Sequence, residues 1–203
     1  MLRAFATTWK LWNALESGLI YPWVRLLFAV NRIPWGQGWR FYGVPVILKH
    51  RHSQMSLGAG LQLRSSLRSN PLGPNHPVTF CTWQAEAVLE IGNNFAMTGG
   101  TLCAAEKIMI GDNVAVGANT TIMDTDFHLL DPVERRARPT EARTAPVVIE
   151  DDVFIGMNCL VLKGVTIGRG SVVGAGSVVT RSVPSGVIVA GNPAQVVRSL
   201  EVC

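Results

Sequence analysis

A repeat of six residues constrains the fold of this chain more than any other feature of its sequence. Aliphatic residues recur at every sixth position without a slip in one run, which is Ile149, Ile155, Val161, Ile167, Val173 and Val179. The fifth position of each unit is small or β-branched, as in Val153, Cys159 and Ser171. An amphipathic helix would instead repeat its apolar residues at steps of three and four. The pattern therefore predicts a short strand and a turn, repeated many times.

The repeat continues upstream with changes of phase. Two further runs keep the step of six: Ile110, Val116 and Ile122, and, one residue out of phase, Ile91, Met97 and Cys103. Stacked units of this kind pair edge to edge as parallel sheets, and their aliphatic residues form ladders that no single unit could bury alone. We therefore expect an all-β solenoid, with Cys103 in the inward aliphatic position and Cys159 in the small position.

Composition and charge narrow the class of protein. The chain has 203 residues, of which 48% are hydrophobic and 16% charged, as in one globular domain of ordinary size. Residues 1–70 hold nine lysines and arginines against one acid, a net charge of +8, whereas residues 71–203 hold nine against thirteen, a net charge of −4. The positive charge of residues 1–70 favours an anionic partner such as a membrane surface or a phosphate-bearing ligand. Basic residues are not interleaved with aromatics as in known nucleic-acid modules, so we expect no nucleic-acid partner.

The first 43 residues form a basic, apolar segment that we predict to be helical. Its most apolar run, residues 18–30, contains Pro22 and Arg25 and falls short of the roughly 20 residues that a spanning helix needs. We expect this segment to pack against the rest of the protein or a neighbouring subunit. Its tryptophans and basic residues make peripheral contact with a membrane surface the alternative. Residues 1–10 lack a secretory signal, and the four cysteines lack metal or disulfide spacing, so we expect a cytoplasmic location, with the inner membrane face as the site of any contact.

One segment breaks the repeat. From Ile122 to Ile149 the chain runs 27 residues, three more than four units of six would take, and the aliphatic pattern is missing inside. Long loops in compact domains are more often functional than idle. We therefore divide the chain into the N-terminal segment 1–43, a β-helix over 44–186 with a protruding loop at about 127–147, and a C-terminal cap and tail over 187–203.

The repeat units resemble a known family. The stretches that carry the resemblance are IGDNVAVGANTTIM, IEDDVFIGMNCLVLKGVTIGRGSVVGAGSVV and VPSGVIVAGNPAQVVR. They are similar to the hexapeptide-repeat acyltransferases, and most of all to the sugar O-acetyltransferases related to galactoside, maltose and Nod-factor acetyltransferases and those of polysaccharide biosynthesis. The resemblance covers residues 88–198, is weaker over 44–87 and is absent before that. It implies a left-handed parallel β-helix, a homotrimer, and acetyl-CoA bound between neighbouring subunits.

The resemblance also implies a reaction. His128 lies where the repeat breaks and matches the position of the family's catalytic histidine, so it would act as the general base that activates an acceptor hydroxyl of a sugar or glycan precursor. Asp126 is the first candidate to orient the ring, and Asp124 is the second. No metal is needed. An N-acetyltransferase acting on an amino sugar is the alternative reaction, and a non-enzymatic scaffold is the alternative function.

Further residues match the family's cofactor cleft or are candidates for the acceptor. For acetyl-CoA the matches are Phe154, where many relatives have Trp, and Gly156, Ala175, Thr180, Arg181 and Arg198. Candidates for substrate contacts are Asp124, Trp83 and Asn94. The arginines of the loop, Arg135, Arg136, Arg138 and Arg143, either pair with neighbouring acids on the surface or contact an anionic acceptor. A zinc-dependent carbonic anhydrase, which shares this solenoid, would need three converging histidines, and only His128 lies near a regular coil.

Overall fold

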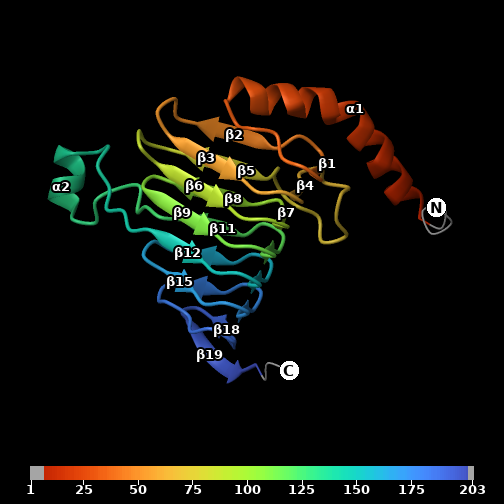
Figure 1. The fold of residues 1–203 in the computed structure, drawn as a ribbon. Coiled ribbons are helices and arrows are strands. Elements are labelled where there is room, and N and C mark those ends of the chain that lie inside the picture. The colour runs from red at the N-terminus through yellow and green to blue at the C-terminus, as the bar shows by residue number, and fades with distance from the viewer. Residues whose placement is uncertain (1–6, 201–203) are drawn as a thin grey trace.

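The computed structural model describes residues 7–200, which form a three-sided solenoid of short strands with a helix across one end (Figure 1). Until the C-terminal hairpin, successive strands join three sheets in rotation, so each sheet collects every third strand along the chain. The pairs within each sheet are parallel until the last hairpin. The predicted parallel sheets are therefore confirmed. The extreme ends of the predicted N-terminal segment and C-terminal tail, including Cys203, lie outside the described residues.

The three sheets have the following strands. Sheet A contains β1 (Arg40–Tyr42), β4 (Gln62–Arg64), β7 (Ala96–Thr98), β10 (Ala115–Val116), β13 (Phe154–Ile155), β16 (Val172–Val173), β18 (Val187–Gly191) and β19 (Ala194–Ser199). Sheet B contains β2 (Val46–Lys49), β5 (Thr79–Thr82), β8 (Thr101–Ala104), β11 (Thr121–Met123), β14 (Leu160–Val161) and β17 (Val178–Val179). Sheet C contains β3 (Gln54–Leu57), β6 (Val88–Ile91), β9 (Lys107–Ile110), β12 (Val147–Ile149) and β15 (Thr166–Ile167).

The core is made of aliphatic ladders, one inside each sheet. On sheet A the register stacks a continuous buried column, which is Phe41, Leu63, Met97, Val116, Ile155, Val173 and Val189. Because every rung is buried only by the rungs above and below it and by the other two sheets, no coil could be stable alone. The step of six in the sequence is the step from one such ladder to the next.

The change of phase near Met97 has a structural cause. Leu102, and not Cys103 as predicted, is in register with Phe80 on β5 and Ile122 on β11. A two-residue turn, Gly99–Gly100, joins β7 to β8, with φ angles of +54° and +92° that favour glycine. This tight turn shortens one unit to five residues and moves the inward position from Cys103 to Leu102.

The N-terminal helix α1 (Thr8–Val30) lies across the first coil, at the end of the solenoid opposite the C-terminus (Figure 1). Its inner face buries Val24 and Phe28, and the Phe28 ring lies 5.2 Å from the Trp39 ring, centroid to centroid. Ser17 Oγ donates a hydrogen bond of 2.6 Å to the Phe41 carbonyl. The predicted N-terminal helix is thus present, and α1 closes the apolar core at this end. At the other end β19 turns back antiparallel to β18.

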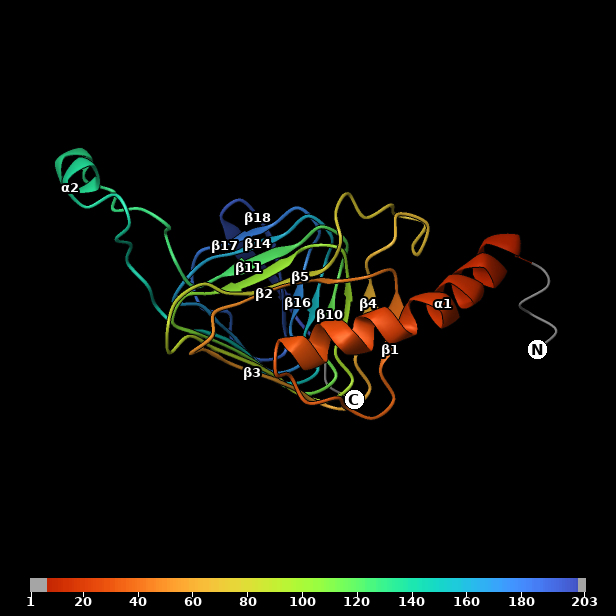
Figure 2. The same cartoon turned by 90° about the horizontal axis from the view of Figure 1, so that it is seen from above.

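Two segments leave the solenoid. Residues 65–78 connect β4 to β5 beside sheet A. Residues 124–146 connect β11 to β12 and carry the short helix α2 (Pro132–Ala137), which stands away from the body (Figure 2). We call this second segment the α2 loop. It leaves from the corner between sheets B and C, which we call the BC corner.

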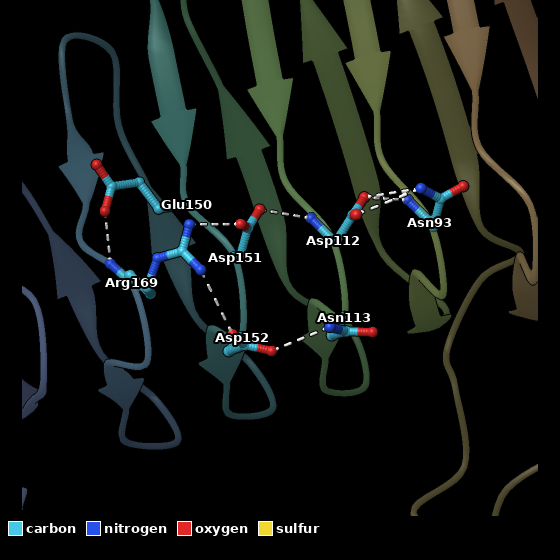
Figure 3. Close-up of polar contacts among 7 residues, drawn as sticks. All are labelled: Asn93, Asp112, Asn113, Glu150, Asp151, Asp152 and Arg169. Carbon is cyan, nitrogen blue, oxygen red and sulfur yellow. Dashed lines mark hydrogen bonds and ion pairs between the residues drawn. The ribbon is translucent and has the colours of Figure 1, made fainter. Parts of the chain in front are cut away.

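The corner between sheets C and A is held by a ladder of short polar side chains (Figure 3). Asp112 accepts a hydrogen bond of 2.6 Å from the Asn93 N–H, and Asp151 accepts one of 2.8 Å from the Asp112 N–H. Asn94, predicted as a substrate residue, belongs to this corner: its φ is +58° and its side chain donates to Asn113 Oδ1 at 2.9 Å. The amide of Asn94 thus stabilises a left-handed turn, and the substrate contact of Asn94 stays a prediction.

Candidate functional site

The α2 loop is fastened to the solenoid at its two ends. Thr125 and Thr144 form an antiparallel bridge, and the Ala145 N–H donates to the Asp124 carbonyl at 3.0 Å. The next coil adds a further tie, because the Gly164 N–H donates to the Ala145 carbonyl at 3.0 Å. The root of the loop is therefore a fixed part of the BC corner, and residues close to the root are held in place.

His128 lies just beyond this root, with its side chain exposed. Its Nδ1 lies 3.3 Å from the Pro139 carbonyl oxygen, on the returning half of the loop. Since a carbonyl can only accept, this contact requires the tautomer with the proton on Nδ1. The lone pair is then on Nε2, which is the atom that a general base needs.

Asp126 does not orient His128 in this structure. Asp126 Oδ1 pairs with Lys163 Nζ at 3.1 Å, on the turn that follows β14. Asp126 Oδ2 is buried and without a hydrogen-bond partner among residues 7–200. The orienting role that the sequence predicted for Asp126 is therefore taken by the Pro139 carbonyl, and the Asp126–Lys163 pair ties the loop to the following coil.

Asp124, the second candidate, is a structural residue. Its carboxylate is fully buried and accepts backbone N–H bonds of 2.7, 2.8 and 2.6 Å from Ala105, Glu106 and Lys107. Burial raises the pKa of the Asp124 carboxyl, and the N–H donors oppose that shift. Both oxygens are engaged in closing the neighbouring turn, which is a structural role, and the substrate contact of Asp124 stays a prediction.

We expect Asp124→Ala to lower the free energy of unfolding by about 2–4 kcal/mol, because it leaves three N–H groups at a buried turn without their acceptor. Chemical denaturation at neutral pH measures the change. Asp131→Ala is the matched control: Asp131 caps α2 by accepting from the N–H groups of Val133 and Glu134 at the surface, so its loss should cost about 1 kcal/mol or less. Equal losses in the two variants would contradict the role given to Asp124.

An exposed aromatic pair lies beside His128. The Trp83 ring, on the turn after β5, meets the Phe127 ring edge-on with 6.4 Å between centroids. Phe127 has a φ of +60°, a conformation that bulky residues rarely adopt without support from their surroundings. The structure thus places Trp83, the predicted sugar-stacking residue, against Phe127, which precedes His128 in the sequence. Trp83 is 60% exposed, so most of its surface is open to a ligand.

Two of the predicted cofactor residues lie on the same BC corner. Thr180 and Arg181 are exposed on the turn after β17, beyond the turn that carries Lys163. The arginines of the α2 loop are partly engaged with their own loop: Arg138 pairs with Glu134 at 3.0 Å and with Glu141 at 2.7 Å, and Arg135 donates to backbone carbonyls. For Arg138 the surface-pairing interpretation is therefore the correct one.

A groove of about 500 Å³ runs over sheet A. Its floor follows from the register, which places the small side chains of Ala96 and Ala115 between Gln62 and Phe154. Three of the predicted cofactor residues line it, namely Phe154, Gly156 and Ala175. Thr180, Arg181 and Arg198 do not. Arg198 is exposed on β19, paired in register with Ile188.

The sequence interpretation missed several residues of this groove. The segment 65–78 supplies one wall through Asn70 and Leu72, and Arg64 supplies a cation. Arg64 lies over the Tyr42 ring at 4.4 Å and donates to the Ser69 carbonyl at 2.6 Å, so its guanidinium is held in place. The only sequence signal was the unusual length of the connection between Leu63 and Phe80 in an otherwise regular repeat.

The residues at the BC corner and the residues that line the groove lie on opposite sides of the chain. In a three-sided solenoid each corner faces away from the remaining sheet, so the BC corner with His128 points away from sheet A with its groove. Figure 2 shows α2 and the strands β4, β10 and β16 of sheet A on opposite sides. One chain therefore cannot bring His128 to a ligand that lies in its own groove.

The chain is similar to known acetyltransferases. A family model described as the hexapeptide repeat of succinyl-transferase matches residues 146–181. A putative acetyltransferase of Schizosaccharomyces pombe is 41% identical over 108 residues, which are 53% of this chain and 50% of that protein. A 2,3,4,5-tetrahydropyridine-2,6-dicarboxylate N-acetyltransferase of Clostridium perfringens is 59% identical over 56 residues, 28% of this chain and 24% of that protein.

Solved structures extend the likeness over most of the chain. A hexapeptide-repeat-containing acetyltransferase of Vibrio cholerae, complexed with acetyl coenzyme A, has a TM-score of 0.51 and 27% identity over 92% of this chain and 86% of that one. A maltose O-acetyltransferase of Clostridium difficile, 22% identical, shares the fold with a TM-score of 0.51 over 93% of this chain and 88% of that one. These matches support a relationship of the chain to the hexapeptide-repeat acetyltransferases. The chain spans half or less of the length of these two curated relatives.

Proposed function

We propose that this chain, as a member of the hexapeptide-repeat acetyltransferases, transfers an acetyl group from acetyl-CoA to a hydroxyl of a sugar or glycan precursor. The observation that carries the proposal is the placement of His128, exposed at a fixed loop root with Nδ1 held by the Pro139 carbonyl. In the proposed reaction Nε2 accepts the proton of the acceptor hydroxyl as its oxygen attacks the thioester carbonyl. The aromatic pair Trp83 and Phe127 would hold the sugar face beside it.

We further propose a left-handed β-helix that assembles as a homotrimer, with each active site shared between two chains. The placement of His128 opposite the groove supports the sharing, because only a second copy can present a groove to the BC corner. In such a site one chain supplies His128, Thr180 and Arg181, and its neighbour supplies Phe154, Gly156 and Ala175. Arg181 would then face the phosphates of CoA, and the apolar groove would hold the pantetheine arm.

An N-acetyltransferase is the second candidate reaction. The match to the Clostridium N-acetyltransferase favours it, although that match covers only 28% of this chain. The same His128 would accept a proton from an ammonium or amine acceptor. Lability of the product to hydroxylamine separates the two reactions, because an ester is cleaved and an amide is not.

Binding of acetyl-CoA distinguishes the proposed acetyltransferase from a non-enzymatic scaffold of the same fold. We expect acetyl-CoA at 100 times its Kd to raise the midpoint of thermal unfolding, since a ligand bound only by the folded state stabilises it by about 2.7 kcal/mol at that ratio. We expect Phe154→Ala to weaken binding about tenfold, because this side chain is 48% exposed and lines the groove. Calorimetric titration measures the Kd. An unchanged melting curve with both CoA and acetyl-CoA would support the scaffold instead.

A further inference from the structure

The face of α1 that points away from the solenoid carries a continuous apolar stripe. Its members, each more than half exposed, are Trp12, Leu15, Leu19, Trp23, Leu26 and Val30. They follow one another at steps of three and four, so at about 3.6 residues per turn they fall within an arc of about 80°. We call this set the α1 stripe.

The stripe is a second apolar face on a helix that already has one. The residues that α1 buries, Asn13, Val24 and Phe28, lie on the opposite side of the helix. Packing on the solenoid therefore accounts for one face and leaves the other uncovered. A helix of 23 residues is about 35 Å long, and the uncovered stripe occupies most of that length. Exposed apolar surface of this extent marks a site of interaction.

A basic pocket of about 340 Å³ adjoins the stripe at the end of α1. Its lining consists of Val30, Asn31, Arg32, Lys49, His50 and Arg51, so three permanent cations and one histidine meet there without an acid in the lining. Lys49 Nζ donates to the Ser53 carbonyl at 2.9 Å, which fixes its ammonium at the rim. Val30 belongs both to the pocket and to the α1 stripe, so the apolar and the cationic surfaces are continuous.

We propose that the α1 stripe and the basic pocket together dock on the surface of an anionic phospholipid bilayer. The stripe enters the boundary between headgroups and acyl chains, where tryptophan is favoured, and the pocket receives a lipid phosphate. None of the helices between residues 7 and 200 is long and apolar enough to cross a membrane, so α1 would lie in the plane of the surface. The inference concerns a partner of the chain and does not depend on acetyl transfer.

Charge favours the bilayer over a second copy of the chain as the occupant. Residues 1–70 carry a net charge of +8, and Glu16 is their single acid. Glu16 accepts from Ser66 Oγ at 3.4 Å, on the solenoid side of α1. A second copy would therefore bring another basic surface and no counter-charge from this region, whereas anionic lipid supplies the charge that the pocket lacks.

Co-sedimentation of the full chain with vesicles tests the proposal. We expect the chain to pellet with vesicles of phosphatidylcholine and phosphatidylglycerol, and less with phosphatidylcholine alone, with the difference shrinking as salt rises. The double variant Leu19→Glu/Trp23→Glu should bind either vesicle at least about tenfold more weakly. Arg51→Glu should remove the preference for phosphatidylglycerol. Val197→Glu, an equally exposed site on β19 at the far end, is the matched control and should bind as the native chain does.

Two results would overturn the proposal. One is failure of the native chain to pellet with either vesicle. The other is a fall in the solution molar mass of Leu19→Glu/Trp23→Glu by light scattering, which would show that the stripe is covered by another copy of the chain. Circular dichroism of each variant confirms that the solenoid is intact. Because the substituted side chains are exposed, we expect no change in the melting temperature.

Discussion

Replacing His128 by alanine should lower kcat for acetyl transfer about 10²- to 10⁴-fold and leave the Kd of acetyl-CoA unchanged. The expected loss is that of a general base, because the variant removes the only group proposed to accept the acceptor proton. The Kd should not change, because the groove on sheet A is proposed to hold acetyl-CoA and His128 is proposed to contact the acceptor hydroxyl. Steady-state rates and calorimetric titration measure the two quantities on the same preparation.

The control for this variant is His52→Ala. His52 is also exposed and lies in the turn between β2 and β3, at the same BC corner. It should leave kcat within about twofold, because nothing in the proposed reaction uses it. A His128→Ala variant with nearly native kcat would remove His128 from the mechanism, whatever its effect on KM.

A mixture of two inactive variants should regain activity if the active site is shared between chains. His128→Ala removes the base, and Ala175→Trp fills the groove with a bulky ring. Each variant alone should be inactive, because every site of the proposed trimer would carry the lesion. In trimers mixed at random from equal amounts, about a quarter of the sites combine an intact His128 with an intact neighbouring groove. Co-refolded mixtures should therefore show about a quarter of the native activity.

The alternative outcome of this experiment is clear-cut. If each site were built within one chain, every site in the mixture would carry one lesion and activity would stay at the level of the single variants. Mixing Ala175→Trp with Trp83→Ala provides a second readout, because Trp83 lies with His128 on the BC corner and should complement in the same way. Complementation of His128→Ala by Trp83→Ala is not expected, because both lesions lie on the same side of the chain.

The ladders could be predicted because their physical cause is local. Each inward position, such as Ile155 or Val173, must be aliphatic wherever it stands, so the repeat appears in the sequence directly. The error at Cys103 shows the limit of this reasoning. A turn shortened by one residue at Gly99–Gly100 shifts the phase, and the count of six cannot distinguish Leu102 from Cys103 when both are apolar.

The contacts of the α2 loop could not be predicted, because they depend on how the loop returns. The Pro139 carbonyl that orients His128 is a backbone atom on the far half of the loop, and any residue could have supplied it. The partner of Asp126 is Lys163, one coil further on. Proximity in sequence suggested Asp126 for His128, whereas the stacking of coils places Lys163 closer to the acid.

The strand order explains why the predicted site residues lie on two different faces of the chain. Every third strand returns to the same sheet, so Phe154 on sheet A and His128 at the BC corner must lie apart. The sequence interpretation grouped Phe154, Gly156, Ala175, Thr180 and Arg181 as one cleft because they match one family motif. Counting strands in threes separates these residues and leads to the proposal of a site shared between two chains.

Release of free CoA from acetyl-CoA in the presence of candidate acceptors tests the central claim most directly. The panel would contain sugars, nucleotide sugars and glycolipid precursors, with His128→Ala measured in parallel. We predict thiol release that needs both His128 and an acceptor carrying a sugar hydroxyl, with one acetyl group added to that acceptor by mass spectrometry and removed again by hydroxylamine. Acceptor-dependent release that is equally fast without His128, or binding of acetyl-CoA with no transfer to any acceptor, would contradict the account.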